Sequence, residues 1–177
     1  MKLKITGIQG LMVFENDFHG DERGFFYESC NEKWFQNKLH FVQSNISYSK
    51  KGVLRGLHIQ TEPFVQGKLV QVIQGEVFDV AIDLRKDSKT YKQWHAETLS
   101  GINHLMMYIP EGFAHGFLAL TDSLFAYSCT NFYSLEHSKT IRWDDEDLGI
   151  IWPKNPTDLS KLDKDAMKFK DYEEEIR

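Results

Sequence analysis

The strongest constraint on the fold is a long stretch, from residue 42 to about 133, in which the side chains follow a strand-like pattern. Between residues 77 and 84, every second side chain is a large apolar one, and a period of two is typical of β-strands. Gly75 and Gly112 fall between such segments and mark turns. Short strands in close succession, with few helical segments, predict a mainly β protein built as a sandwich or barrel of the jelly-roll kind.

The flanking segments predict shorter elements around this barrel core. Residues 3–15 are expected to form a strand with a break at the two glycines it contains, and residues 20–24 a turn that leads into a strand over 25–29. Residues 31–38 predict one or two turns of helix.

The chain is expected to form one domain over residues 1–177. Its barrel core would span about 42–133, and a C-terminal helical tail would span about 159–177. No internal repeat, low-complexity stretch or linker divides the 177 residues, a length sufficient for a sizeable core.

Composition excludes several classes of function. Hydrophobic residues make up 41% of the chain and aromatic ones 14%, which favours a folded protein over a disordered one. The net charge of −5 argues against a nucleic-acid binder. Cys30 and Cys129 are the two cysteines of the sequence, so a reducing cytoplasm is expected. The N-terminus has no apolar signal core, and no run is long enough for a membrane span.

The residues with the clearest chemical potential are a histidine and a lysine ten positions apart, His58 and Lys68, in the same stretch of alternating strands. An enzyme that removes a proton beside a carbonyl needs a base and a cation that stabilises the resulting enolate oxygen. His115 and Tyr127 follow in the same stretch.

Several motifs, in order along the chain, resemble those of the dTDP-4-dehydrorhamnose 3,5-epimerase family, and the resemblance covers about residues 5–166. Each motif is weak alone, and together they are specific. They are Asp21–Glu28, Val42–Ser47, Gly52–Gln60, Gln66–Val70, Gly75–Val80, Ile109–Phe117, Ile141–Asp145 and Leu159–Asp163.

The resemblance implies a cupin-type jelly-roll barrel with short peripheral helices and a C-terminal helix, usually assembled as a homodimer. It implies an isomerase that needs no metal and no organic cofactor, and whose substrate is a nucleotide-linked 4-keto-6-deoxy sugar. Such a site requires a base on one face of the sugar, an acid on the other and a stabiliser for the enolate. The implied pathway supplies precursors of bacterial surface polysaccharide, such as capsule or lipopolysaccharide.

The resemblance also assigns four catalytic residues. His58 matches the base and Asp163 the carboxylate that orients it. Tyr127 matches the acid, and Lys68 matches the enolate stabiliser. Each has a plainer alternative: a hydrogen-bonded core histidine, a packing tyrosine, a solvent-facing lysine, and a capping box formed by Ser160 and Asp163 at the start of the tail helix.

Eight further positions match substrate-binding residues of the family. His115 would line the sugar pocket, and Tyr133 would pack against the nucleotide base. Positions that hold the nucleotide and pyrophosphate are matched by Arg23, Glu28, Gln43, Asn45, Ser47 and Arg55. Arginine suits phosphate because its planar fork gives two parallel charged hydrogen bonds.

One segment departs from the family pattern. Leu135 stands where a proline is common, and Ser138 stands where a glutamate is usual. Because the family has this segment beside the base pocket, the alternatives include a GDP-linked 4-keto sugar or a heptose. Inversion at C3 alone, rather than at both C3 and C5, is a further alternative.

Two other classes of function compete with the epimerase. A metal-dependent cupin would use His115 in the second half of the usual metal motif, but the first half offers only His58, and two ligands are too few. A non-catalytic sugar-nucleotide binding module is the other class. We expect such a binder to have lost part of the base, acid and cation set, which this sequence retains.

Overall fold

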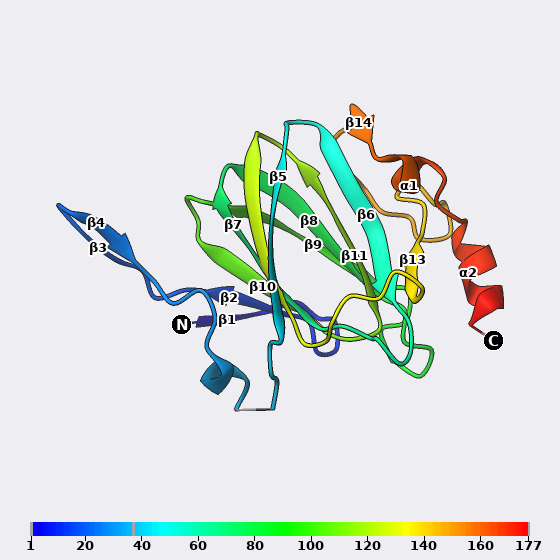
Figure 1. Cartoon of the computed structure of the whole chain (residues 1–177), viewed down its shortest axis with the longest axis horizontal. Helices are drawn as coiled ribbons and strands as arrows, with labels where there is room; N and C mark the ends of the chain where they lie inside the picture. The colour runs from blue at the N-terminus through cyan, green and yellow to red at the C-terminus, as the bar shows by residue number, and fades with distance from the viewer. Residues whose placement is uncertain (1, 37, 177) are drawn as a thin grey trace.

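The structure is a computed structural model that describes residues 2–36 and 38–176, so the expectations for residues 1, 37 and 177 lie outside it. Two sheets face each other across the molecule (Figure 1). The first has the order β1-β2-β10-β7-β12-β5. Its strands are β1 (Lys2–Ile5), β2 (Met12–Glu15), β5 (Gln43–Ser49), β7 (Lys68–Gln74), β10 (Leu105–Ile109) and β12 (Ser123–Cys129).

The second sheet has the order β13-β6-β11-β8-β9. Its strands are β6 (Val53–Gln60), β8 (Glu76–Asp83), β9 (Trp94–Ser100), β11 (Phe113–Ala119) and β13 (Ser138–Thr140), and β14 (Asp158–Leu159) pairs with β6 in parallel. The prediction of a mainly β fold is confirmed. Strands on both sides of residues 42–133 join the two sheets, so the sheets extend beyond the range expected for the barrel core.

The main core lies between the sheets. Val13, Val70 and Phe125 of the first sheet pack there with Val77 and Phe117 of the second. Burying a side chain of this size stabilises the fold by about 1.5–3 kcal/mol. The core therefore holds the two sheets together and fixes the positions of side chains that point between them.

Strand β8 is buried on both faces. Val77 and Ala81 point into the main core, whereas Val80 and Ile82 pack on the outer side of the second sheet. This explains why apolar residues occur in both alternating sets of the strand.

The C-terminal segment covers the outer side of the second sheet, where Phe169 and Tyr172 are buried. The helical tail expected over about residues 159–177 is not one continuous helix in the described residues. Two short helices form instead, α1 (Lys161–Lys164) and α2 (Phe169–Glu175). Between them, Met167 accepts a hydrogen bond from Arg142 N and donates one to the Thr140 carbonyl oxygen. These tertiary bonds replace the bonds that a continuous helix would make.

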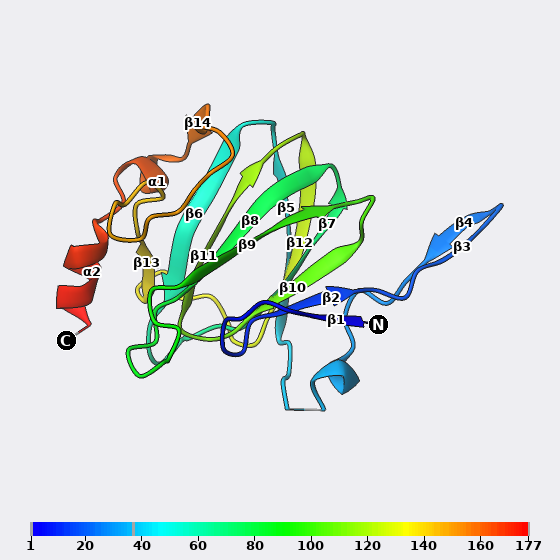
Figure 2. The same ribbon diagram turned by 180° about the vertical axis from the view of Figure 1, so that it is seen from behind.

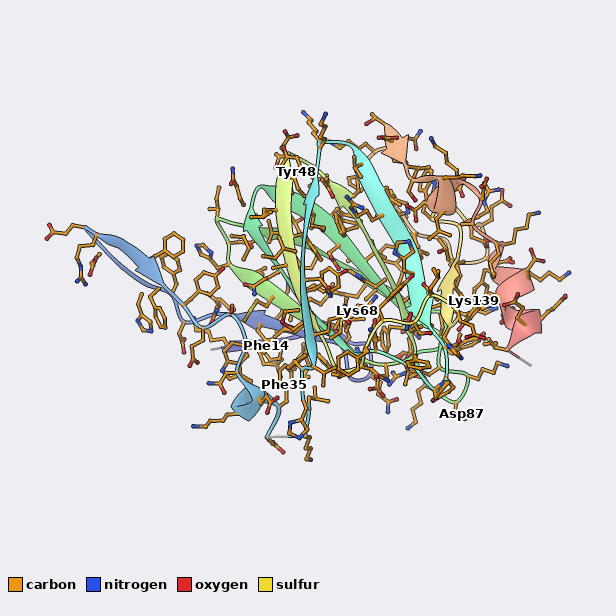
Figure 3. All side chains as sticks on the ribbon, viewed as in Figure 1. Phe14, Phe35, Tyr48, Lys68, Asp87 and Lys139 are labelled. Atoms are coloured by element: carbon orange, nitrogen blue, oxygen red, sulfur yellow. The ribbon has the colours of Figure 1, made fainter. Side chains whose placement is uncertain are left out.

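A short 3₁₀ helix, η1 (Glu32–Phe35), covers the outer side of the first sheet, in agreement with the turns of helix expected there. Phe35 packs on Phe14, with ring centroids 5.6 Å apart (Figure 3). The strand expected over residues 25–29 is shorter. Strand β4 (Gly24–Phe26) pairs with β3 (His19–Asp21) in a hairpin that projects from the barrel (Figures 1 and 2).

Candidate active site

A hollow between the two sheets contains three of the four predicted catalytic residues. It has an outer part of about 400 Å³ and an inner part of about 180 Å³. His58, Lys68 and Tyr127 line both parts, so the two parts meet at these three side chains. The outer part is also lined by Gln43, Asn45, Ile59, Gln60, Gln66, Cys129, Tyr133, Ser138 and Leu162, and the inner part by Ser47, Arg55, His115, Phe117 and Phe125.

The three shared residues come from different sheets. His58 lies on β6 of the second sheet, whereas Lys68 and Tyr127 lie on β7 and β12 of the first. Lys68 is near the centre of the molecule in the view of Figure 3. A ligand in the hollow would therefore have the imidazole on one side and the phenol on the other.

Asp163 of α1 contacts the imidazole ring of His58. His58 Nε2 lies 2.7 Å from Asp163 Oδ1, and the exposed fractions of the two side chains are 35% and 3%. Within the described residues, no hydrogen bond reaches the other ring nitrogen, Nδ1. His58 Nδ1 is therefore the atom that could accept a proton from a ligand.

The carboxylate of Asp163 is held in its charged form. Burial raises the pKa of Asp163, but hydrogen bonds from His58, Ser160 and the backbone N–H of Gly56 outweigh burial and lower it. A buried anion beside the imidazole fixes the ring orientation. The nearby Asp158 and Asp165 are not the partners of His58 among the described residues.

His115 lies beside His58 on the adjacent strand, because β11 pairs with β6 in the register His115↔His58. The strands approach closely at Gly56 and Gly116. A Cβ added to Gly56, which has φ +127°, would lie 2.5 Å from Gly116 Cα. Two residues without side chains are needed for this approach.

His115 has its own carboxylate partner. Its Nε2 lies 2.9 Å and 3.0 Å from the two carboxylate oxygens of Asp79, which is fully buried. Sequence reasoning did not select Asp79 as a site residue. The sequence did contain a signal for it. Asp79 alternates with Val77 and Ala81 along one strand, so it shares the face of the strand that points to the main core.

Lys68 is a cation without a paired anion in the hollow. Burial lowers the pKa of Lys68, and nearby Cys129 and Asp79 oppose this only in part. The described residues give its ammonium group no ion pair. Lys68 is half-buried, and a cation in such a position favours a ligand that carries or develops negative charge.

Tyr127 is half-buried, and its phenol remains neutral at physiological pH. Burial raises the pKa of Tyr127, and the neighbouring Cys129 thiol adds to the effect. The side chain therefore reaches the hollow as a proton donor.

Strand β5 presents polar groups to the hollow at every second position: Gln43, Asn45 and Ser47. Gln43 Oε1 accepts a hydrogen bond from Tyr133 N at 3.1 Å, and Gln43 Nε2 donates one to Asn45 Oδ1 at 2.9 Å. The Ser47 hydroxyl is buried without a hydrogen-bond partner in the described residues.

The predicted arginines have different environments. Arg55 lines the inner part of the hollow, where its Nε donates to Ser49 Oγ at 2.9 Å and is thereby held in place. Arg23 lies in the projecting hairpin, has an 86% exposed side chain and pairs with Asp21 at 2.6 Å. Neither Arg23 nor Glu28 lines the hollow of its own chain.

The two histidines of the alternative metal motif each contact a carboxylate: His58 contacts Asp163, and His115 contacts Asp79. In the described part of the chain, no group of three or more His, Cys, Asp or Glu side chains is placed to hold a metal ion. The structure also has no helix, within the residues it describes, that is both long and apolar enough to cross a membrane.

Comparison with protein families decides the relationship. The family model for dTDP-4-dehydrorhamnose 3,5-epimerase matches residues 5–171. The chain belongs to this family. The predicted family is therefore confirmed, and the cupin-type barrel expected of the epimerases agrees with the two facing sheets.

Individual epimerases of the family are similar to this chain over most of its length. The dTDP-4-dehydrorhamnose 3,5-epimerase of Shigella flexneri is 49% identical over 171 residues, which is 94% of each chain. That of Methanothermobacter thermautotrophicus is 51% identical over 86% of this chain and 84% of its own. A solved epimerase of Legionella pneumophila, in complex with dTDP-4-keto-L-rhamnose, has a TM-score of 0.91 and 45% identity, covering 96% of this chain and 93% of that one.

Proposed function

We propose that this chain is an epimerase that inverts C3 and C5 of a dTDP-linked 4-keto-6-deoxy sugar, converting dTDP-4-dehydro-6-deoxyglucose into dTDP-4-dehydrorhamnose. The observation that carries the proposal is the arrangement of His58 and Tyr127, which come from opposite sheets and line the same hollow. Inversion needs a base and an acid on opposite faces of the sugar ring.

The reaction follows from these positions. The C4 carbonyl acidifies the hydrogens on C3 and C5, so His58 Nδ1 takes a proton and the electron pair moves to the carbonyl oxygen as an enolate. The ammonium group of Lys68 stabilises this oxygen, and Asp163 stabilises the imidazolium. Tyr127 then gives its phenolic proton to the opposite face of the carbon. Solvent returns a proton to the phenolate and removes one from the imidazolium before the next inversion.

The nucleotide is proposed to be dTDP, because the relatives reported above are named for it. Ser138, where the family commonly has a glutamate, lines the outer part of the hollow. Turnover of dTDP- and GDP-linked 4-keto-6-deoxy sugars, measured separately at equal concentrations, tests the assignment. We expect kcat/KM to be at least about 100-fold higher for the dTDP sugar. A preference for the GDP sugar would overturn it.

Lys68→Met should separate activity from stability. Loss of the ammonium group should lower kcat/KM by about 10²–10³-fold, because the enolate loses its charged partner. The pKa of Lys68 is lower in the folded than in the unfolded protein. At a pH under both pKa values, the charged lysine therefore lowers the free energy of unfolding by its full amount. This loss shrinks as the pH rises from the folded-state pKa toward the unfolded-state pKa. At neutral pH the variant should therefore gain about 1 kcal/mol in free energy of unfolding.

Denaturant unfolding and steady-state kinetics check both changes. The exposed Lys50, which directly follows β5, provides the control, since Lys50→Met should alter neither quantity. A Lys68→Met enzyme with wild-type kcat/KM would contradict the role of Lys68.

A homodimer would reconcile the family match of Arg23 and Glu28 with their distance from the hollow. Both lie in or next to the projecting hairpin, where Phe25 and Phe26 are 64% and 66% exposed. Exposed aromatic side chains on a projecting element favour contact with another protein surface. We propose that the hairpin of one copy supplies Arg23 and Glu28 to the nucleotide end of the other copy's site.

Subunit complementation tests this arrangement. Arg23→Ala and His58→Asn enzymes should each be weak alone. After unfolding and refolding together, mixed dimers would contain one site with both an intact His58 and an intact partner hairpin. Activity should recover to about a quarter of wild type, since half the dimers are mixed and half their sites are intact. No recovery would place Arg23 in its own chain's site, and wild-type activity of Arg23→Ala alone would place it outside any site.

We place the enzyme in the cytoplasm, in the supply of deoxysugar precursors for capsule or lipopolysaccharide. Both cysteines are free, Cys30 exposed and Cys129 buried, which agrees with a reducing compartment. Cell fractionation with an antibody to the chain would check the location.

A further inference from the structure

The segment that carries Asp163 is aligned along β6, the strand that carries His58. Thr157 N donates to the Gly52 carbonyl oxygen at 2.9 Å, and β14 then pairs with β6 in the register Leu159↔Leu54. Ser160 follows β14 directly as the N-cap of α1. The path of the backbone therefore places α1 next to the imidazole ring of His58.

Ser160 and Asp163 form two reciprocal hydrogen bonds. The Ser160 hydroxyl donates to Asp163 Oδ2 at 2.6 Å and accepts from Asp163 N at 3.1 Å. The other carboxylate oxygen, Oδ1, receives His58 Nε2 at 2.7 Å and Gly56 N at 3.2 Å. The Asp163 side chain is 3% exposed, and among the described residues Ser160 is the one that donates a hydrogen bond to its Oδ2.

We infer that Ser160 is a positioning residue for the epimerase reaction, because its hydroxyl holds the Asp163 carboxylate in the orientation that His58 needs. This inference rests on the proposed function. Without the hydroxyl, Oδ2 would lose a charge-assisted hydrogen bond, and the carboxyl plane could rotate away from the ring. The cap of α1 and the orientation of the base therefore depend on one side chain.

Replacement of Ser160 by glycine separates the two roles. Glycine caps helices almost as well as serine but has no hydroxyl, whereas Ser160→Thr retains one. For Ser160→Gly we expect kcat to fall about tenfold, with KM within about twofold of wild type. Deuterium incorporation at C3 and C5 should slow by the same factor, because His58 serves both carbons. Ser160→Thr should stay within about twofold of wild type in every quantity.

Two kinetic outcomes would overturn the inference. One is a Ser160→Gly enzyme with kcat within about twofold of wild type, and the other is a Ser160→Thr enzyme as slow as Ser160→Gly. If the glycine variant does not fold, Ser160→Cys replaces it, since a thiol is a weak donor of similar size. A cysteine variant at the wild-type rate would also contradict the role.

A measurement without substrate separates this inference from the proposed function. The Asp163 carboxyl carbon can be followed by ¹³C NMR as pH is lowered in the free protein. Because the Ser160 bond helps to lower the pKa of Asp163, that carboxyl should titrate at higher pH in Ser160→Gly than in wild type. An unchanged titration would contradict the positioning role, even if the enzyme acts on another sugar.

Discussion

Replacement of His58 by asparagine should reduce kcat/KM by at least about 10³-fold and stop proton exchange at both C3 and C5. Asparagine can still donate a hydrogen bond to Asp163 but cannot accept a proton at neutral pH. The buried carboxylate keeps a partner, so the fold should persist. Steady-state kinetics and deuterium exchange in heavy water measure the two losses.

The control for this variant is a histidine outside the hollow. His40 has a side chain that is 74% exposed and pairs with Glu32 at 3.1 Å, and His40→Asn should leave kcat/KM unchanged. Binding of dTDP to His58→Asn, measured by calorimetry, should match wild type and so show an intact site. If His58→Asn still exchanges deuterium into the sugar at the wild-type rate, His58 is not the base.

Tyr127→Phe should uncouple proton removal from inversion. His58 can still form the enolate, so deuterium should enter the substrate. Without the phenol, however, no side chain returns a proton to the opposite face, and formation of the inverted product should fall by about 10²-fold or more. Mass spectrometry of the recovered substrate and NMR of the product distinguish the two processes.

Tyr48 gives the matched control. It lies on the neighbouring strand β5, away from Lys68 in the view of Figure 3, and its hydroxyl donates to Asp122 at 2.9 Å. Tyr48→Phe should invert normally. Normal inversion by Tyr127→Phe would show that another group supplies the acid.

The sequence predicted the local and periodic parts of this protein well. The period of two in β8 placed the strand, because alternate side chains must face opposite sides of a sheet. The spacing of Ser160 and Asp163 predicted a capping box, and the structure confirms that Ser160 caps α1. The same carboxylate also contacts His58, so capping of α1 is compatible with the role proposed for Asp163 beside the base.

Features that depend on contacts between distant segments were not predictable in this way. The tail pattern fits a helix, but Met167 bonds to the backbone of Thr140 and Arg142 and interrupts it. The pairing of Asp79 with His115 depends on the register between β8 and β11. A single sequence does not state that register.

The position of Arg23 depends on where the hairpin projects. Motif matching associates Arg23 with the nucleotide, whereas the fold of one chain places it outside the hollow. A motif gives the chemistry of a residue without its location in space.

The most direct test of the central claim is turnover of dTDP-4-keto-6-deoxyglucose in heavy water, read by mass spectrometry with the positions of label assigned by NMR. We expect deuterium at both C3 and C5 of the inverted product, with both signals absent in His58→Asn. Deuterium at C3 alone would reduce the assignment to a single-centre epimerase. A sugar that stays unlabelled with the wild-type enzyme would contradict the proposed reaction on this substrate.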